Sequence, residues 1–103
     1  MTEEIRLSGP TLRVLKWLLE KPLNEVSGAE VSRAVGVGSG TLYPLLARLE
    51  RANWLASKWE QVDPAEVGRP RRRLYKLTGL GQNRALSALS EFQLTSGELA
   101  WKL

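Results

Sequence analysis

The sequence contains no cysteine and no histidine. Without cysteine there are no disulfide bonds, no thiol nucleophile and no thiolate ligand for zinc. The absence of histidine removes the side chain that most often serves as a general base and as a metal ligand. The carboxylates follow no catalytic motif. The sequence therefore argues against an enzyme and predicts neither a metal ion nor another cofactor.

Long apolar runs are also missing, and none approaches the roughly 20 residues that a membrane-spanning helix needs. The acidic opening at residues 2–4 is unlike the basic start of a signal peptide. We therefore expect no membrane association and a cytoplasmic location. A chain of 103 residues is expected to form one domain with a modest core, leaving some apolar surface for a partner.

The net charge of +4 is unevenly distributed along the chain. Residues 33–76 hold nine of the fifteen Lys and Arg residues but four of the eleven Asp and Glu residues. A local excess of positive charge favours an anionic partner at this segment over general solubility.

Helix signals appear early in the chain. Ser8 followed by Pro10 is typical of a helix start, and Pro22 is expected to end that helix. Ser27 and Glu30 have the spacing of a capping box, which predicts a second, short helix. A short strand is expected between the two helices, at residues 24–26.

A third helix is expected from about Thr41 to Ala52. Thr41 is favoured over Ser39 as its N-cap, because Pro44 then falls in the first turn, where its missing N–H costs little. The apolar face follows the i, i+3, i+4, i+7 pattern of a core-facing helix and comprises Leu42, Leu45, Leu46 and Leu49.

Two segments rich in strand-forming residues follow, at 54–62 and 72–78, and turn residues lie between them. Together they predict a hairpin with a long tip, after which Thr78 is expected to cap a last helix. The predicted fold is α+β and mainly α. It is a winged helix-turn-helix over residues 1–78, with a C-terminal dimerisation helix over residues 79–103.

In such a fold the third helix enters the DNA major groove with its N-terminal residues facing the bases. We expect this helix to contact DNA through Ser39, Thr41, Tyr43, Pro44, Arg48 and Arg51. Two alternatives stay open. Arg48 and Arg51 would otherwise form a solvated face beside a neighbouring acid, and Tyr43 would pack half-buried against the first helix.

The basic loop of the hairpin reads GRPRRR and suits phosphate, because each arginine carries a planar, permanently charged fork. Arg69, Arg71 and Arg72 are the predicted DNA contacts. Strand alternation sends Arg71 and Arg73 to one face and Arg72 to the other. One or two arginines are therefore expected to be structural, with Glu60 or Glu66 as partner.

GTLYPLLARLERANWL at residues 40–55 and GRPRRRLYKLT at residues 68–78 together resemble the PadR family of bacterial winged-helix transcriptional regulators. The resemblance covers roughly residues 7–82. It implies a homodimer that binds a pseudo-palindromic operator, usually as a repressor, and in some members a small aromatic or lipophilic effector at the dimer interface. Asn53 replaces the family's glycine but also tolerates the left-handed conformation. The short C-terminal region is similar to the compact branch, in which one helix makes the dimer.

From Gln82 onward the chain shows a 3-4 spacing suited to a helix–helix seam. The members of this seam are Ala85, Leu89, Phe92, Ser96, Leu99 and Leu103. The alternative is that this helix packs on the first helix of its own chain. Trp101, with Trp17, is the candidate platform for a small aromatic effector, although core or interface packing is the favoured explanation for both residues. Trp54 and Trp59 are expected to be cross-strand or core residues.

These patterns predict a DNA-binding regulator that binds half-sites about one helical turn, ~34 Å, apart. The alternative is a winged-helix interaction module whose basic wing binds an acidic protein.

Overall fold

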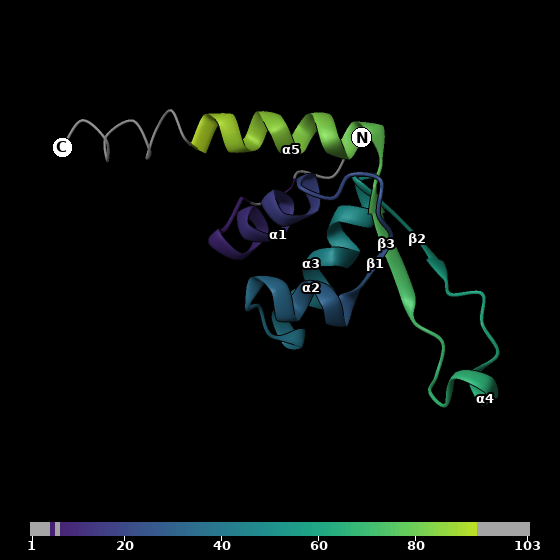
Figure 1. The fold of residues 1–103 in the computed structure, drawn as a ribbon. Coiled ribbons are helices and arrows are strands. Elements are labelled where there is room, and N and C mark those ends of the chain that lie inside the picture. The colour runs from purple at the N-terminus through teal and green to yellow at the C-terminus, as the bar shows by residue number, and fades with distance from the viewer. Residues whose placement is uncertain (1–4, 6, 93–103) are drawn as a thin grey trace.

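The computed structural model describes residue 5 and residues 7–92. Within them the elements are α1 (Gly9–Leu19), β1 (Val26–Ser27), α2 (Gly28–Val35), α3 (Ser39–Arg51), β2 (Leu55–Trp59), α4 (Pro64–Val67), β3 (Arg73–Leu77) and α5 (Gly79–Phe92). Figure 1 shows α1, α2 and α3 grouped beside a small sheet, with α5 lying along α1. The predicted fold is confirmed: it is a mainly helical winged helix-turn-helix.

The first two helices begin where the sequence predicts. Ser8 is the N-cap of α1 and accepts a hydrogen bond from the Thr11 N–H at 3.3 Å. The capping box of α2 is complete, because Glu30 N–H donates to Ser27 Oγ at 3.2 Å and Ser27 N–H donates to Glu30 Oε1 at 3.1 Å. Both caps satisfy backbone donors that a helix start leaves open.

The predicted start of the third helix is wrong. The N-cap of α3 is Gly38, and the Leu42 N–H donates to the Gly38 carbonyl at 2.9 Å. Pro44 is therefore the sixth helical residue and leaves the Gly40 carbonyl without its helical donor. Gly40 is exposed, so water can hydrate that oxygen. The early start follows a turn that buries Val37, and this packing outweighs the lost hydrogen bond.

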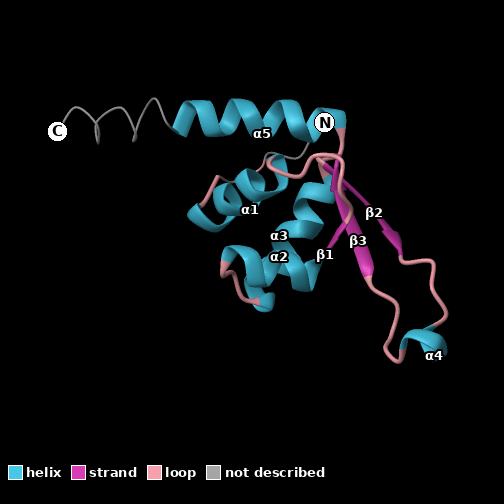
Figure 2. Ribbon diagram, in the orientation of Figure 1, coloured by secondary structure: helices cyan, strands magenta, loops and turns pink. Residues whose placement is uncertain are grey.

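The sheet has the strand order β1-β3-β2, and both pairs of strands are antiparallel. The register of β2 and β3 places Leu55 opposite Leu77, Ser57 opposite Tyr75 and Trp59 opposite Arg73. Leu55, Tyr75 and Leu77 are buried, so this is the inner face of the sheet. We call residues 55–77 the wing, which extends beyond the helices as a long hairpin (Figure 2).

The tip of the wing contains α4, where the sequence predicts turn residues. The Asp63 side chain caps this single turn by accepting from the Ala65 N–H at 2.9 Å, and Gly68 ends it with a φ of 67°. A sequence of Asp, Pro and later Gly fits a turn and a capped helical turn equally well.

At the base of the wing, two segments of the chain cross: residues 53–54, which follow α3, and residues 78–81, which begin α5. Asn53 turns the chain out of α3 in the left-handed conformation that its side chain tolerates, with a φ of 65°. The Thr78 hydroxyl donates to the Asn53 carbonyl at 2.6 Å and accepts from the Gly81 N–H at 2.9 Å. At Gly81 a Cβ atom would lie 1.9 Å from the Trp54 carbonyl oxygen. The expectations for Asn53 and Thr78 are thereby confirmed.

One core joins the helices to the inner face of the sheet. Its largest fully buried side chains are Leu15, Leu18, Leu42, Leu46 and Leu49. α5 contributes Ala85 and Ala88, which are 0% and 5% exposed, and small residues of this kind allow α5 to lie close to α1. Among the described residues, no helix is long and apolar enough to cross a membrane.

Substitution of Gly81 by alanine tests the crossing at the base of the wing. The added methyl group meets backbone rather than a flexible side chain, so we expect the free energy of unfolding to fall by about 3 kcal/mol. Gly79→Ala is the matched control in the same helical turn. Its Cβ has no neighbour within 4 Å, and the change should stay within about 0.5 kcal/mol. Chemical denaturation measures both, and equal effects would contradict the close contact.

Candidate nucleic-acid interface

The side of α3 away from the core is accessible along its length. Its leucines at positions 42, 45, 46 and 49 are buried, which confirms the predicted core face. The predicted DNA contacts on this helix are all exposed: Ser39, Thr41, Tyr43, Pro44, Arg48 and Arg51. The N-terminal half of α3 therefore offers backbone N–H groups, hydroxyl groups and an aromatic ring on one surface.

Tyr43 lies at the contact between α3 and the start of α2. A Cβ atom on Gly28 would approach the Tyr43 ring to 2.6 Å, so the ring packs directly over that glycine. This contact is with the second helix, whereas the alternative for Tyr43 placed the ring against the first helix. The side chain is still 46% exposed, and it is thus supported on one side and open on the other.

Tyr75 connects this surface to the wing. Burial raises the pKa of its hydroxyl above the ordinary value, and the nearby Glu50 and Tyr43 raise it further. Ser57, the cross-strand partner of Tyr75, donates to the Glu50 carboxylate of α3, so the inner face of the wing begins beside α3.

Arg69 is held inside the wing by a bidentate ion pair with Glu60. Its Nη1 and Nη2 lie 2.7 and 3.0 Å from the two carboxylate oxygens. The Arg72 N–H also donates to Glu60, at 3.2 Å. The hydrogen bond from Arg69 is the main reason why the pKa of Glu60 falls to about 2. Arg69 is a predicted DNA contact, but both terminal nitrogens of its guanidinium already bind Glu60.

Arg71 and Arg72 are the exposed arginines of the tip. The Arg71 Nε donates to the Val62 carbonyl at 2.9 Å, which orients the side chain and leaves its two terminal nitrogens accessible. The Arg72 guanidinium makes no hydrogen bond or ion pair with any residue that the structure describes. These two side chains are placed to meet an external anion.

Arg73 belongs to a network that the sequence pattern does not reveal. Its Nε donates to Ser57 Oγ at 3.0 Å, its Nη2 lies 3.9 Å from Glu50, and its guanidinium lies 5.1 Å from the centre of the Trp59 ring. The predicted cross-strand role of Trp59 is confirmed, but the residue is not core, since it is 59% exposed. Only the strand register reveals this pairing, and the register was not available from the sequence.

The predicted seam of α5 begins inside the chain's own core. Ala85 is completely buried there as a member of the core cluster, so it cannot contribute to a dimer face, and the prediction for this residue is wrong. Leu89 is half-buried, and Phe92 is the last residue of α5. The remaining predicted members of the seam, and the proposed effector residue Trp101, lie outside the described residues.

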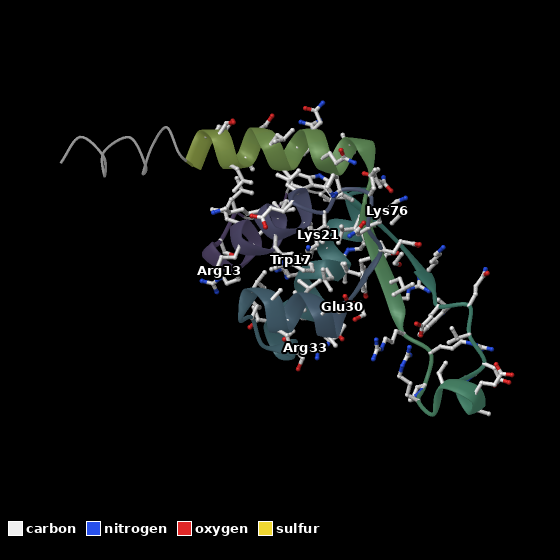
Figure 3. All side chains as sticks on the ribbon, in the orientation of Figure 1. Arg13, Trp17, Lys21, Glu30, Arg33 and Lys76 are labelled. Carbon is white, nitrogen blue, oxygen red and sulfur yellow. The ribbon has the colours of Figure 1, made fainter. Side chains whose placement is uncertain are left out.

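Trp17 lines a shallow cavity of about 520 Å³ between the end of α1 and the start of α2. The Lys21 ammonium lies 5.6 Å from the centre of its ring, and both residues are labelled in Figure 3. Within residues 5 and 7–92, no group of acidic side chains is arranged to hold a metal ion.

Comparison with protein families gives a match to the transcriptional regulator PadR-like family over residues 19–87. This span contains α2, α3, the wing and the first part of α5. No curated protein sequence matches the chain.

Solved structures share the fold at low sequence identity. A PadR family transcription regulator from hypervirulent Clostridium difficile is 22% identical, with a TM-score of 0.72 over 91% of this chain and 97% of that one. The protein smu.1704 from Streptococcus mutans is 23% identical, with a TM-score of 0.67 over 92% and 86%. A mutant of MepR from Staphylococcus aureus, bound to an oligodeoxyribonucleotide, is 18% identical, with a TM-score of 0.69. This match covers 94% of the present chain, which spans 66% of the MepR chain.

The ion pair in the wing predicts an acid titration. In the folded protein Glu60 should titrate near pH 2 instead of 4.5. Its lowered pKa means that the ionised pair stabilises the fold fully above pH 4.5 and is lost as the pH falls toward 2. Arg69→Ala should move the midpoint upward, whereas Arg13→Ala on α1 should not. Carboxyl carbon shifts in NMR follow the titration, and an unchanged midpoint in Arg69→Ala would contradict the pairing.

Proposed function

The chain belongs to the PadR-like family of DNA-binding transcriptional regulators, and we propose that it represses transcription as a homodimer on a pseudo-palindromic operator. The proposal includes a cytoplasmic location. Its strongest support is one juxtaposition, in which α3, whose outward side is exposed, packs against β2 of a wing whose tip presents Arg71 and Arg72.

The geometry divides the work between base and phosphate contacts. In a helix-turn-helix the second helix lies in the major groove with its N-terminal residues at the base edges. We assign base-edge contacts to Tyr43 and Arg48, and phosphate contacts to Ser39, Thr41 and the open N–H groups of α3. Arg51, one turn farther along, and Pro44 complete the surface that faces the duplex.

The wing tip supplies the remaining charge. Arg71 and Arg72 are exposed, and no described residue forms a hydrogen bond with their terminal nitrogens, so they are assigned to the phosphates or the minor groove that flank the α3 site. Arg69 is assigned a supporting role, because its fork already binds Glu60.

The dimer is assigned to the C-terminal part of α5. Leu86 is 58% exposed on this helix, and Leu89 is half-buried beside it. A symmetric pairing of two α5 helices would cover both side chains and place two α3 helices about one DNA turn, ~34 Å, apart. The predicted seam continues with Phe92, Leu99 and Leu103.

A small aromatic effector is a further part of the proposal. Trp17 is half-buried and lines the cavity at the end of α1, where Lys21 adds a positive charge beside its ring. Aromatic rings at such cavities bind flat ligands. The second proposed residue is Trp101.

A gel shift with the promoter region of the protein's own gene distinguishes this function from the alternative, in which the basic wing binds an acidic protein. The regulator requires a salt-sensitive and sequence-selective shift, and its absence would reject the proposal.

The double variant Arg71→Ala/Arg72→Ala tests the wing tip. We expect weaker binding to the promoter duplex, and a slope of log affinity against log salt that falls by about 0.9 for each lost phosphate contact. The matched control is Lys58→Ala/Lys76→Ala, which removes the same charge from the outer face of the same strands. Figure 3 places Lys76 near the base of the wing. An unchanged slope in the arginine variant would remove both arginines from the contact list.

Leu86→Glu tests the dimer. In a symmetric dimer this variant replaces two buried leucines by two carboxylates. The favourable burial of both leucines is lost, so the dimer Kd should rise at least about tenfold. Ser87→Glu is the control, because it adds the same charge about 100° farther around the helix. Sedimentation over a concentration series measures both variants, and circular dichroism checks that each is folded. A dimer unaffected by Leu86→Glu would place the interface elsewhere.

A further inference from the structure

Trp59 is exposed although nothing in the local fold requires it. With 59% of its surface accessible, it is the most exposed aromatic residue among those whose burial the structure describes. Leaving a large ring in water forgoes the favourable free energy of burying it. A side chain in such a position points to a partner that covers it.

The position of Trp59 follows from the strand register. Ser57 and Tyr75 form one cross-strand pair, and Trp59 and Arg73 form the next pair on the same face. Two residues along a strand advance by about 6.6 Å. Because Ser57 donates to Glu50 of α3 and Arg73 Nη2 lies 3.9 Å from the same carboxylate, Trp59 and Arg73 lie between α3 and the tip of the wing.

Arg73 is held in place before any partner binds. Its Nε is bound to Ser57, its Nη2 lies near Glu50, and its guanidinium carbon lies over the Trp59 ring, 5.1 Å from the ring centre. Among the described residues, Nη1 has no hydrogen-bond partner. The Arg73 guanidinium is already fixed by these contacts, and one of its terminal nitrogens is unoccupied. It is therefore preorganised for a phosphate oxygen, and binding costs little side-chain entropy.

We propose that Trp59 and Arg73 form a platform for the DNA backbone strand that passes between the groove filled by α3 and the wing tip. Arg73 donates to a phosphate, and the Trp59 ring packs on the adjacent deoxyribose. The inference rests on the proposed function, because it requires duplex DNA on α3. A duplex is favoured over a protein partner because Arg71 and Arg72 carry the positive surface onward along the same wing.

A contact with the DNA backbone does not depend on the base sequence, so the experiment compares two duplexes of different sequence. Affinity is measured by fluorescence anisotropy for a promoter duplex and for an unrelated duplex of the same length. Trp59→Ala should weaken both about tenfold, and Trp59→Phe should retain most of the affinity, since a phenyl ring also presents a flat apolar face to the sugar. Arg73→Gln should lower the salt slope by about 0.9 for each contact, whereas Arg73→Lys should keep the slope.

Lys76→Gln is the matched control on β3, since it removes one charge from the opposite face of the sheet and should change neither affinity nor slope. Thermal unfolding identifies any variant that fails to fold. Phosphate ethylation interference is measured with the wild-type protein, so its result does not depend on whether a Trp59 variant folds. Ethylation should interfere at phosphates between the α3 site and the wing site, and Arg73→Gln should remove those signals alone.

The outcomes separate the two proposals. Wild-type affinity in Trp59→Ala and Arg73→Gln, with weakened binding in Arg71→Ala/Arg72→Ala, would overturn the platform and leave the regulator intact. A wild-type protein that binds neither duplex would overturn the regulator itself. A loss on the promoter duplex alone would make the pair a base contact and would also overturn the backbone platform.

Discussion

The arrangement of the whole fold depends on the crossing at the base of the wing. Thr78 binds the carbonyl that follows α3 and the N–H that opens α5, and Gly81 lets the two segments touch. Asn53 makes the preceding turn possible without glycine. Because the same few atoms end α3, start β2 and start α5, they determine together how the recognition helix, the wing and the C-terminal helix are oriented.

Acidic residues organise the basic wing. Glu60 holds Arg69, and Glu50 helps to hold Arg73, so each carboxylate converts a flexible cation into a positioned one. These pairs reduce the net charge that the wing offers to DNA. In exchange they orient the hairpin, so that Arg71 and Arg72 are presented from an ordered tip. A count of arginines therefore overstates the contacts and understates the order of the wing.

Local signals predicted the elements that are stabilised locally. The Ser8 cap, the Ser27–Glu30 box and the left-handed Asn53 each involve atoms within a few residues of one another. The prediction of where α3 starts is wrong for the opposite reason. The rule that places proline in a first turn concerns one hydrogen bond, whereas burial of Val37 and the leucines of α3 concerns the entire core.

The sequence by itself determined the winged helix-turn-helix, the exposed face of α3 and the arginine-rich wing, because hydrophobic period, caps and turn residues act at short range. Tertiary structure alone decided which arginine is free and which is paired. It also decided that Ala85 belongs to the core and that the Arg73 guanidinium lies over the Trp59 ring. These outcomes depend on strand register and helix docking, which bring together residues that are distant in the chain.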